Sequence, residues 1–220
     1  MGRKHVYCGI DPSLVELGIA FIEPEKLLRC LVMKTKRGIL GFKDKEDNIW
    51  SNIARCREIS MHVFAMVEMM KPICVCVELA AYGGGGKGRR KNMRSVRQMD
   101  MIQYAVHDAL LRVSHDFEVV SVYPTSRAKF IAGSGKASKE TVVEYVNKWS
   151  GMPGLITNDN GCDAIALARI AEAYSTGKDM KKITHTTVMK TEFGDIGYYI
   201  GECTKFDPTA KKLIHVESLI

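Results

Sequence analysis

Residues 73–79, with the sequence ICVCVEL, constrain the fold more than any other stretch of the chain. They form an almost uninterrupted apolar run, and Pro72 separates them from a segment over 48–70 whose apolar residues recur at helical spacing. A second segment with helical spacing follows over 95–114. A short apolar strand between two helices is typical of a strand in the middle of a parallel sheet. The run therefore predicts an α/β fold.

The order of the remaining segments narrows this fold class. Residues 5–11, 17–23 and 26–35 predict three strands in an antiparallel meander, and residues 117–123 predict a fifth strand. The segments that predict the later helices are a short piece from Pro124, residues 137–149 with Ser138 as N-cap, and residues 158–174. This is the element order of the ribonuclease H-like fold. We therefore expect a five-stranded mixed sheet, with three antiparallel strands plus two parallel ones, flanked by helices.

The end of the chain has a different pattern. Its segments ITHTTVMK, GYYIGECTKF and KKLIHVESLI alternate polar and apolar residues as strands do. The sequence thus predicts a main domain over 1–175 and a β-rich C-terminal extension over 176–220. It leaves open whether this extension continues the sheet, contributes to a dimer interface or binds a partner.

Cysteine usage and hydropathy bear on the cellular compartment. The seven cysteines are odd in number and scattered through apolar segments, as expected for buried thiols in a reducing environment. No apolar run approaches the length of a membrane span, and the opening MGRKHVYCG lacks the apolar core of a signal peptide. We therefore expect a cytoplasmic protein that makes no use of a membrane.

Carboxylates stand at the ends of two predicted strands and near the start of the last helix. Asp11 ends the first strand, Glu78 ends the central one, and Asp163 follows Asp159 and Asn160 by four and three residues. Taken singly, each acid can be read as a strand end or a helix-start charge. In the predicted fold the first and central strands are parallel neighbours, so Asp11 and Glu78 emerge at the same edge. Together the acids predict a site for hard divalent cations.

Positive charge gathers in one segment, although the net charge is only +7. Residues 87–97, KGRRKNMRSVR, contain no acid and follow a run of glycines at 83–86. A solvated surface run is one reading. The other is a mobile loop that wraps a nucleic-acid backbone. The candidate DNA contacts in and around this loop are Tyr82, Lys87, Arg89, Arg90, Lys91 and Arg94, and those around the later GSG turn are Lys129, Lys136 and Lys139.

Four blocks give the chain a resemblance to the RuvC family of Holliday junction resolvases over about residues 5–175. They are GIDPSLVELGIAFIE, VCVELAAYGGG, PTSRAKFIAGSGKASKETV and DNGCDAIALARIA. The resemblance places Asp11, Glu78 and Asp163 on the metal-binding acids of the family. At the fourth ligand position the chain departs from the family and has Asn160, so either Asn160 or the preceding Asp159 is the auxiliary ligand.

The resemblance also implies an activity. Family members are homodimers that bind four-way DNA in recombination and repair and cut two strands symmetrically. Each active site would use two Mg²⁺ ions, or Mn²⁺, and leave 5′-phosphate and 3′-hydroxyl ends. The glycine-arginine loop and the tail after residue 175 depart from the bacterial pattern. They favour a bacteriophage or viral member that works in a bacterial host cytoplasm and also cuts forks and flaps.

Two other functions use the same sequence features. A ribonuclease H-type enzyme that cuts RNA–DNA hybrids would need the same acids, so only its substrate would distinguish it. A non-catalytic protein that binds branched DNA on the same fold is the second alternative. Such a protein would be expected to lack at least one of Asp11, Glu78 and Asp163, and all three are present.

Overall fold

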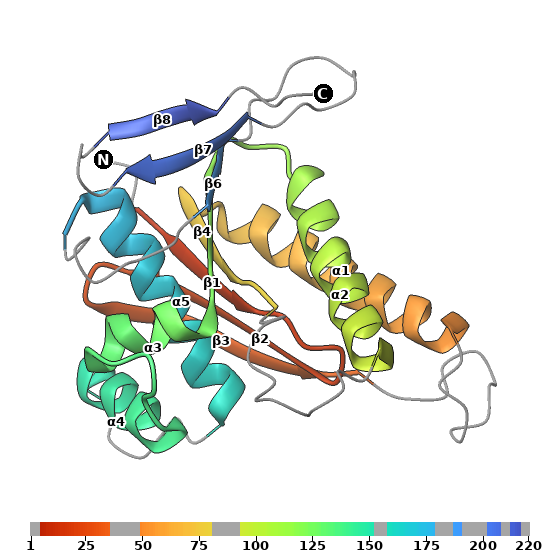
Figure 1. The fold of residues 1–220 in the computed structure, drawn as a ribbon, viewed down its shortest axis with the longest axis horizontal. Helices are drawn as coiled ribbons and strands as arrows, with labels where there is room; N and C mark the ends of the chain where they lie inside the picture. The colour runs from red at the N-terminus through yellow and green to blue at the C-terminus, as the bar shows by residue number, and fades with distance from the viewer. Residues whose placement is uncertain are drawn as a thin grey trace.

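The computed structural model describes residues 5–35, 49–80, 93–151, 158–178, 187–190, 202–207 and 212–216. Within these residues the framework is an eight-stranded sheet with the order β3-β2-β1-β4-β5-β6-β7-β8 (Figure 1). The strands are β1 (Tyr7–Asp11), β2 (Glu16–Glu23), β3 (Lys26–Lys34), β4 (Cys74–Glu78), β5 (Glu118–Val122), β6 (Thr187–Lys190), β7 (Glu202–Asp207) and β8 (Lys212–Val216). The helices are α1 (Ile49–Met70), α2 (Met93–Leu111), α3 (Pro124–Ala132), α4 (Lys139–Ser150) and α5 (Asp159–Thr176).

The first five strands have the predicted topology. Strand β2 pairs antiparallel with both β1 and β3, whereas β4 runs parallel to β1 and β5 runs parallel to β4. Tyr7 lies opposite Cys74, and Glu78 lies opposite Val122. The predicted α/β class, with three antiparallel strands plus two parallel ones, is therefore confirmed. Because β1 and β4 are parallel neighbours, their carboxyl ends reach the same edge of the sheet.

The C-terminal strands lengthen this sheet. Strand β6 pairs antiparallel with β5, β7 with β6, and β8 with β7. Continuation of the sheet was one of the three roles that the sequence left open for the extension. The division into a domain over 1–175 and an extension over 176–220 stays a prediction.

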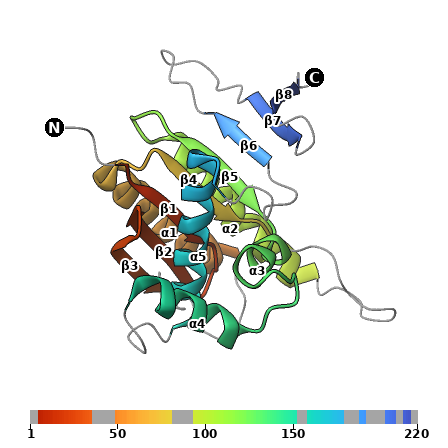
Figure 2. The same ribbon diagram turned by 90° about the vertical axis from the view of Figure 1, so that its left-hand side faces the viewer.

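Helices cover both faces of the sheet. In Figure 2, α5 lies in front of the sheet and α1 and α2 lie behind it. Side chains alternate along β1, so Cys8 and Ile10 pack into the core under α1 and α2 while Tyr7 packs against α5. The described cysteine side chains are free thiols, and all except the half-buried Cys30 are buried, as predicted. The parallel strands are thus apolar on both sides, which explains the uninterrupted run in β4.

Two glycines allow α5 to lie directly on the sheet. A Cβ atom on Gly9 would lie 2.0 Å from the Ala164 carbonyl oxygen, and a Cβ atom on Gly18 would lie 2.2 Å from the Asn160 carbonyl oxygen. Real Cβ atoms do not approach backbone this closely, so only glycine fits at these two positions. The alanine-rich sequence of α5 helps this close packing, and most of the helix is buried. The first turns of α5 are therefore fixed beside the ends of β1 and β2.

The helix termini follow local sequence signals. Ser138 caps α4 by accepting a hydrogen bond from the Thr141 amide, as predicted. Asn158 caps α5 in the same way, since its Oδ1 accepts from the Gly161 amide at 3.0 Å. None of the helices in the described ranges is long and apolar enough to cross a membrane.

Candidate active site

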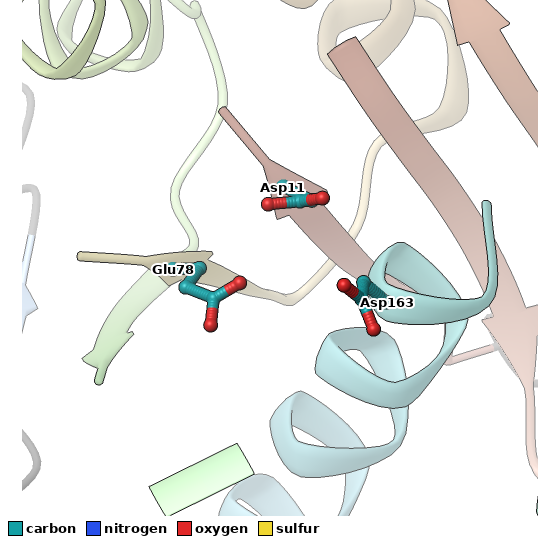
Figure 3. Close-up of side chains that lie close together, drawn as sticks. All are labelled: Asp11, Glu78 and Asp163. Atoms are coloured by element: carbon teal, nitrogen blue, oxygen red, sulfur yellow. The ribbon is translucent and has the colours of Figure 1, made fainter. Parts of the chain in front are cut away.

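Three carboxylates from separate elements meet at one edge of the sheet. Asp11 is the last residue of β1, Glu78 is the last residue of β4, and Asp163 lies one turn into α5. Figure 3 shows the three side chains around a common space. Each offers an oxygen within 4.8 Å of those offered by the other two. The structure therefore brings together the three acids that the sequence singled out, and we call them the acid cluster.

Burial makes the negative charge in this cluster costly. Glu78 is only 6 % exposed, although it is a carboxylate. Burial raises the pKa of Glu78 to about 8, the Arg127 guanidinium opposes that rise, and the neighbouring Asp11 carboxylate adds to it. Burial also raises the pKa of Asp11, again against the effect of Arg127. Burial therefore disfavours the charged form of both carboxyls, and a bound cation would relieve the same cost.

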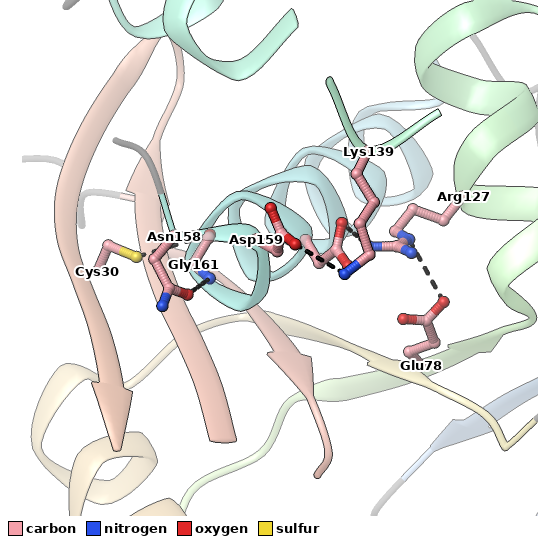
Figure 4. A network of polar contacts seen from close by, with 8 residues as sticks. Cys30, Glu78, Arg127, Lys139, Asn158, Asp159 and Gly161 are labelled. Carbon is pink, nitrogen blue, oxygen red and sulfur yellow. Dashed lines mark hydrogen bonds and ion pairs between the residues drawn. The ribbon is translucent and has the colours of Figure 1, made fainter. Parts of the chain in front are cut away.

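Arg127 of α3 reaches into the acid cluster, and the sequence analysis did not identify it. Its Nε lies 3.3 Å from Glu78 Oε1, as Figure 4 shows. Its Nη1 contacts Asp163 Oδ1. The arginine side chain is 13 % exposed. The sequence did offer one signal for Arg127, which is its position three residues after Pro124 and just beyond the end of β5. The end of β5 lies beside the end of β4, which carries Glu78.

The donor set fits a hard divalent cation. Carboxylate oxygens are the ligands that Mg²⁺ and Mn²⁺ prefer, and all three acids supply them within a short distance of one another. Glu78 Oε1 is buried and makes no hydrogen bond, although the charged Arg127 Nε lies 3.3 Å away. A buried carboxylate oxygen without a hydrogen bond is a group that a cation would satisfy. The identity of the metal stays a prediction.

The two candidates for a fourth ligand lie in different surroundings. Asp159 Oδ2 accepts a hydrogen bond from Lys139 Nζ at 2.7 Å, as Figure 4 shows. In the part of the chain that the structure describes, the acid cluster includes Asp11, Glu78 and Asp163 and does not extend to Asp159. Asn160 lies one helical turn before Asp163 on α5.

The predicted DNA contacts are placed unequally. Lys139 bonds to Asp159 and lies close enough to the acid cluster for its charge to oppose the rise in the pKa of Asp11. Its side chain is 75 % exposed. The bond to Asp159 raises the pKa of Lys139. Lys129 on α3 and Lys136 in the following turn are also exposed. Arg94 lies in α2, but its side chain falls outside the described residues, as do Tyr82, Lys87, Arg89, Arg90 and Lys91 altogether.

A small cavity lies beside the acid cluster. It has a volume of about 170 Å³ and extends from Asp11 and Glu78 to Met99 and Gln103 of α2, with Pro124 on its border. Gln103 Nε2 donates a hydrogen bond to the Glu78 carbonyl oxygen at 2.8 Å. This contact ties the end of β4 to α2, the helix that begins within the predicted basic segment. The sequence analysis did not identify Gln103, since a polar residue within a helix gives no signal of its own.

Comparisons with known proteins agree with these features. The crossover junction endodeoxyribonuclease RuvC of Prochlorococcus marinus is 27 % identical over 164 residues, which cover 73 % of this chain and 91 % of that protein. The enzyme of the same name from Chlamydia muridarum is 27 % identical over 177 residues, covering 79 % and 95 %. No protein-family model matches the chain.

The fold is shared with a solved RuvC. The Thermus thermophilus RuvC, solved in complex with a Holliday junction substrate, superposes with a TM-score of 0.60 at 22 % identity, covering 79 % of this chain and 96 % of that one. At this identity the superposition establishes the ribonuclease H-like fold. The chain is thus similar over most of its length to enzymes named crossover junction endodeoxyribonuclease RuvC, and it shares the fold of a solved RuvC.

Proposed function

We propose that this protein is a metal-dependent endodeoxyribonuclease that resolves Holliday junctions by paired phosphodiester hydrolysis. The acid cluster is the observation that carries the proposal, because its three acids come from separate elements and meet within 4.8 Å. The similarity of the chain to enzymes named crossover junction endodeoxyribonucleases supports junction DNA as the substrate. A protein that only bound DNA would gain nothing from crowding buried carboxylates near phosphates.

The residues of the site have separable tasks in such a reaction. Asp11, Glu78 and Asp163 would hold two Mg²⁺ or Mn²⁺ ions through their oxygens. Bound cations would supply an activated water and neutralise charge on the phosphate and the leaving oxygen. The cavity beside Asp11 and Glu78 would seat the phosphodiester, and the exposed Lys139 would contact a flanking phosphate. The products would carry 5′-phosphate and 3′-hydroxyl ends.

We propose further that the protein acts as a homodimer, since paired cuts require two active sites. A groove of about 600 Å³ between α1 and α2 supports a second copy as the partner. It combines apolar groups with side chains of both signs, and Tyr104 on its border is 78 % exposed. In a twofold dimer the same groove of each copy would meet and bury these apolar groups. The groove residues are Ile53, Cys56, Arg57, Ser60, Asp100, Met101, Tyr104, Ala105, Asp108 and Arg112.

The wider parts of the hypothesis rest on the sequence. The basic segment from Lys87 to Arg94 would contact DNA near the crossover, and forks and flaps would be further substrates. A phage or viral source, acting in the host cytoplasm, stays a prediction from the departures in the loop and the tail.

One set of reactions tests the proposal. Labelled four-way junctions, forks, flaps, linear duplexes and RNA–DNA hybrids are incubated with the protein and Mg²⁺ or Mn²⁺. We expect symmetric cuts in the four-way junction, no cleavage of linear duplex, and no cleavage in excess chelator. Preferential cleavage of the hybrid would favour the ribonuclease H-type alternative. Junction binding without any cleavage would favour the non-catalytic one.

A further inference from the structure

Arg127 is an unusual neighbour for residues that would hold divalent cations. It comes from α3, while the acids it contacts come from β4 and α5. Its guanidinium carries a permanent positive charge, as arginine side chains do in proteins. A cation held by Glu78 and Asp163 would therefore meet a fixed positive charge that already contacts both carboxylates.

The contacts of Arg127 resemble those of a counter-ion more than those of a fixed structural bond. Its Nε and Nη1 are buried, but neither makes a hydrogen bond of good geometry. Its pairing with the acids is thus mainly one of charge. Arg127 also opposes the rise in pKa of both Asp11 and Glu78, so its charge acts on the whole acid cluster.

We propose that Arg127 is an internal counter-ion that occupies the cation position of the acid cluster and is displaced from Glu78 and Asp163 when divalent cations bind. This inference rests on the metal site of the proposed function. Like charges repel strongly in a partly buried site, so the guanidinium and the cations compete for the same oxygens. Arg127 thereby lowers the metal affinity of the enzyme and stabilises the fold when metal is scarce.

Displacement leaves Arg127 well placed for a second contact. Pro124, at the start of the same helix, borders the cavity next to Asp11 and Glu78. A guanidinium released from the acids would stay at this wall, where a phosphate oxygen of the substrate is the next available anion.

Mn²⁺ affinity, measured by electron paramagnetic resonance on DNA-free protein, tests the proposal without relying on activity. Arg127→Met removes the charge and keeps a similar length, so we expect at least about tenfold tighter Mn²⁺ binding. Arg127→Lys keeps the charge and should bind Mn²⁺ within about threefold of wild type. The matched control is Arg169→Met, which removes a half-buried arginine paired with Glu172 on the same sheet face and should leave the affinity unchanged.

Stability in chelator supplies a second readout. In chelator, Arg127→Met should have a lower melting temperature than wild type. Addition of Mn²⁺ should raise its melting temperature by more than it raises that of wild type. If this variant does not fold, the side-chain Nε–H signal of Arg127 in wild-type protein is followed by NMR during Mg²⁺ titration. It should shift saturably while that of Arg169 does not.

The outcomes separate this inference from the proposed function. Unchanged or weaker Mn²⁺ binding in Arg127→Met overturns the proposal that Arg127 is a counter-ion. An Arg127 Nε–H signal that does not shift with Mg²⁺ overturns it as well. Tight Mn²⁺ binding in Arg127→Met with none in wild type supports it strongly. Undiminished Mn²⁺ affinity in Asp11→Asn would instead mean that Mn²⁺ does not bind at the acid cluster. The proposed metal site and the inference about Arg127 would then both be wrong.

Discussion

Helix α5 carries two clusters of buried charge that are built on different principles. Near its end, Arg169 pairs with Glu172 one turn further along the same helix, and the guanidinium lies 5.0 Å from the ring centre of Trp149. This pair is local in sequence and balanced in charge. Near its start, α5 contributes to the acid cluster, which draws on two strands and has three carboxylates against the one guanidinium of Arg127.

The difference separates structural charge from functional charge. A local pair of opposite charges carries no excess of either sign, although burial still raises the pKa of Glu172. A buried cluster with excess negative charge stores a cost that a bound cation would offset. The unequal composition of the two clusters is therefore the physical reason to assign the metal site to one of them and not to the other.

The largest difference should appear in cleavage. Asp11→Asn removes a predicted metal ligand and should lower four-way junction cleavage by roughly three orders of magnitude or more. Junction binding should persist or tighten, because a negative charge near phosphate is lost. Glu172→Gln changes the structural pair and should leave the cleavage rate of folded protein within about threefold of wild type. Equal losses of cleavage rate in both variants, measured on labelled junctions, would contradict the distinction between the two charge clusters.

The two clusters should also differ in how pH affects stability without metal. The folded-state pKa of Glu78, about 8, lies above its ordinary value of 4.5, so the folded protein binds this proton more tightly than the unfolded chain. The resulting stability is fully present below pH 4.5 and is lost as pH rises towards 8, by on the order of 5 kcal/mol. Urea denaturation in chelator at pH 5 and pH 8.5 would measure the loss. Glu78→Gln should remove most of it, and an undiminished loss in that variant would contradict the assigned pKa.

Divalent metal ions should reverse this loss of stability at high pH. A cation that binds only the folded protein at 100 times its Kd adds about 2.7 kcal/mol of stability. We expect Mg²⁺ to raise the melting temperature of wild type and of Arg169→Met alike. Asp163→Asn should lose most of that gain in the same thermal melts. An equal gain in Asp163→Asn would mean that Mg²⁺ binds elsewhere.

The smallest expected effect concerns the border of the acid cluster. Asp159 is engaged by Lys139 and stands outside the cluster, so Asp159→Asn should change cleavage by less than about tenfold. Asn160→Ala should have the larger effect, as the residue one turn before Asp163. Initial rates on one junction would rank the two, and the reverse order would identify Asp159 as the auxiliary ligand.

Much of the fold could be predicted because its signals are local. The apolar run in β4, the helical spacing before Pro72 and the N-cap Ser138 each act within a few residues. The meeting of Asp11 and Glu78 followed from strand direction alone. Arg127 could not be predicted, because its role depends on where α3 packs relative to the acids. The place of the C-terminal strands depends on the pairing of β6 with β5. The alternation of polar and apolar residues within a strand does not specify its partner strand.

The contact between α5 and β1 has a consequence for anyone who would redesign this enzyme. A single methyl group at Gly9 would collide with the backbone at Ala164 and Ala168, so the helix and the strand behave as one rigid block. Asp11 and Asp163 are mounted on that block, and their separation is set by main-chain packing rather than by side-chain choice. Adjustable geometry therefore lies on the other side of the site, where β4 and α3 carry Glu78 and Arg127.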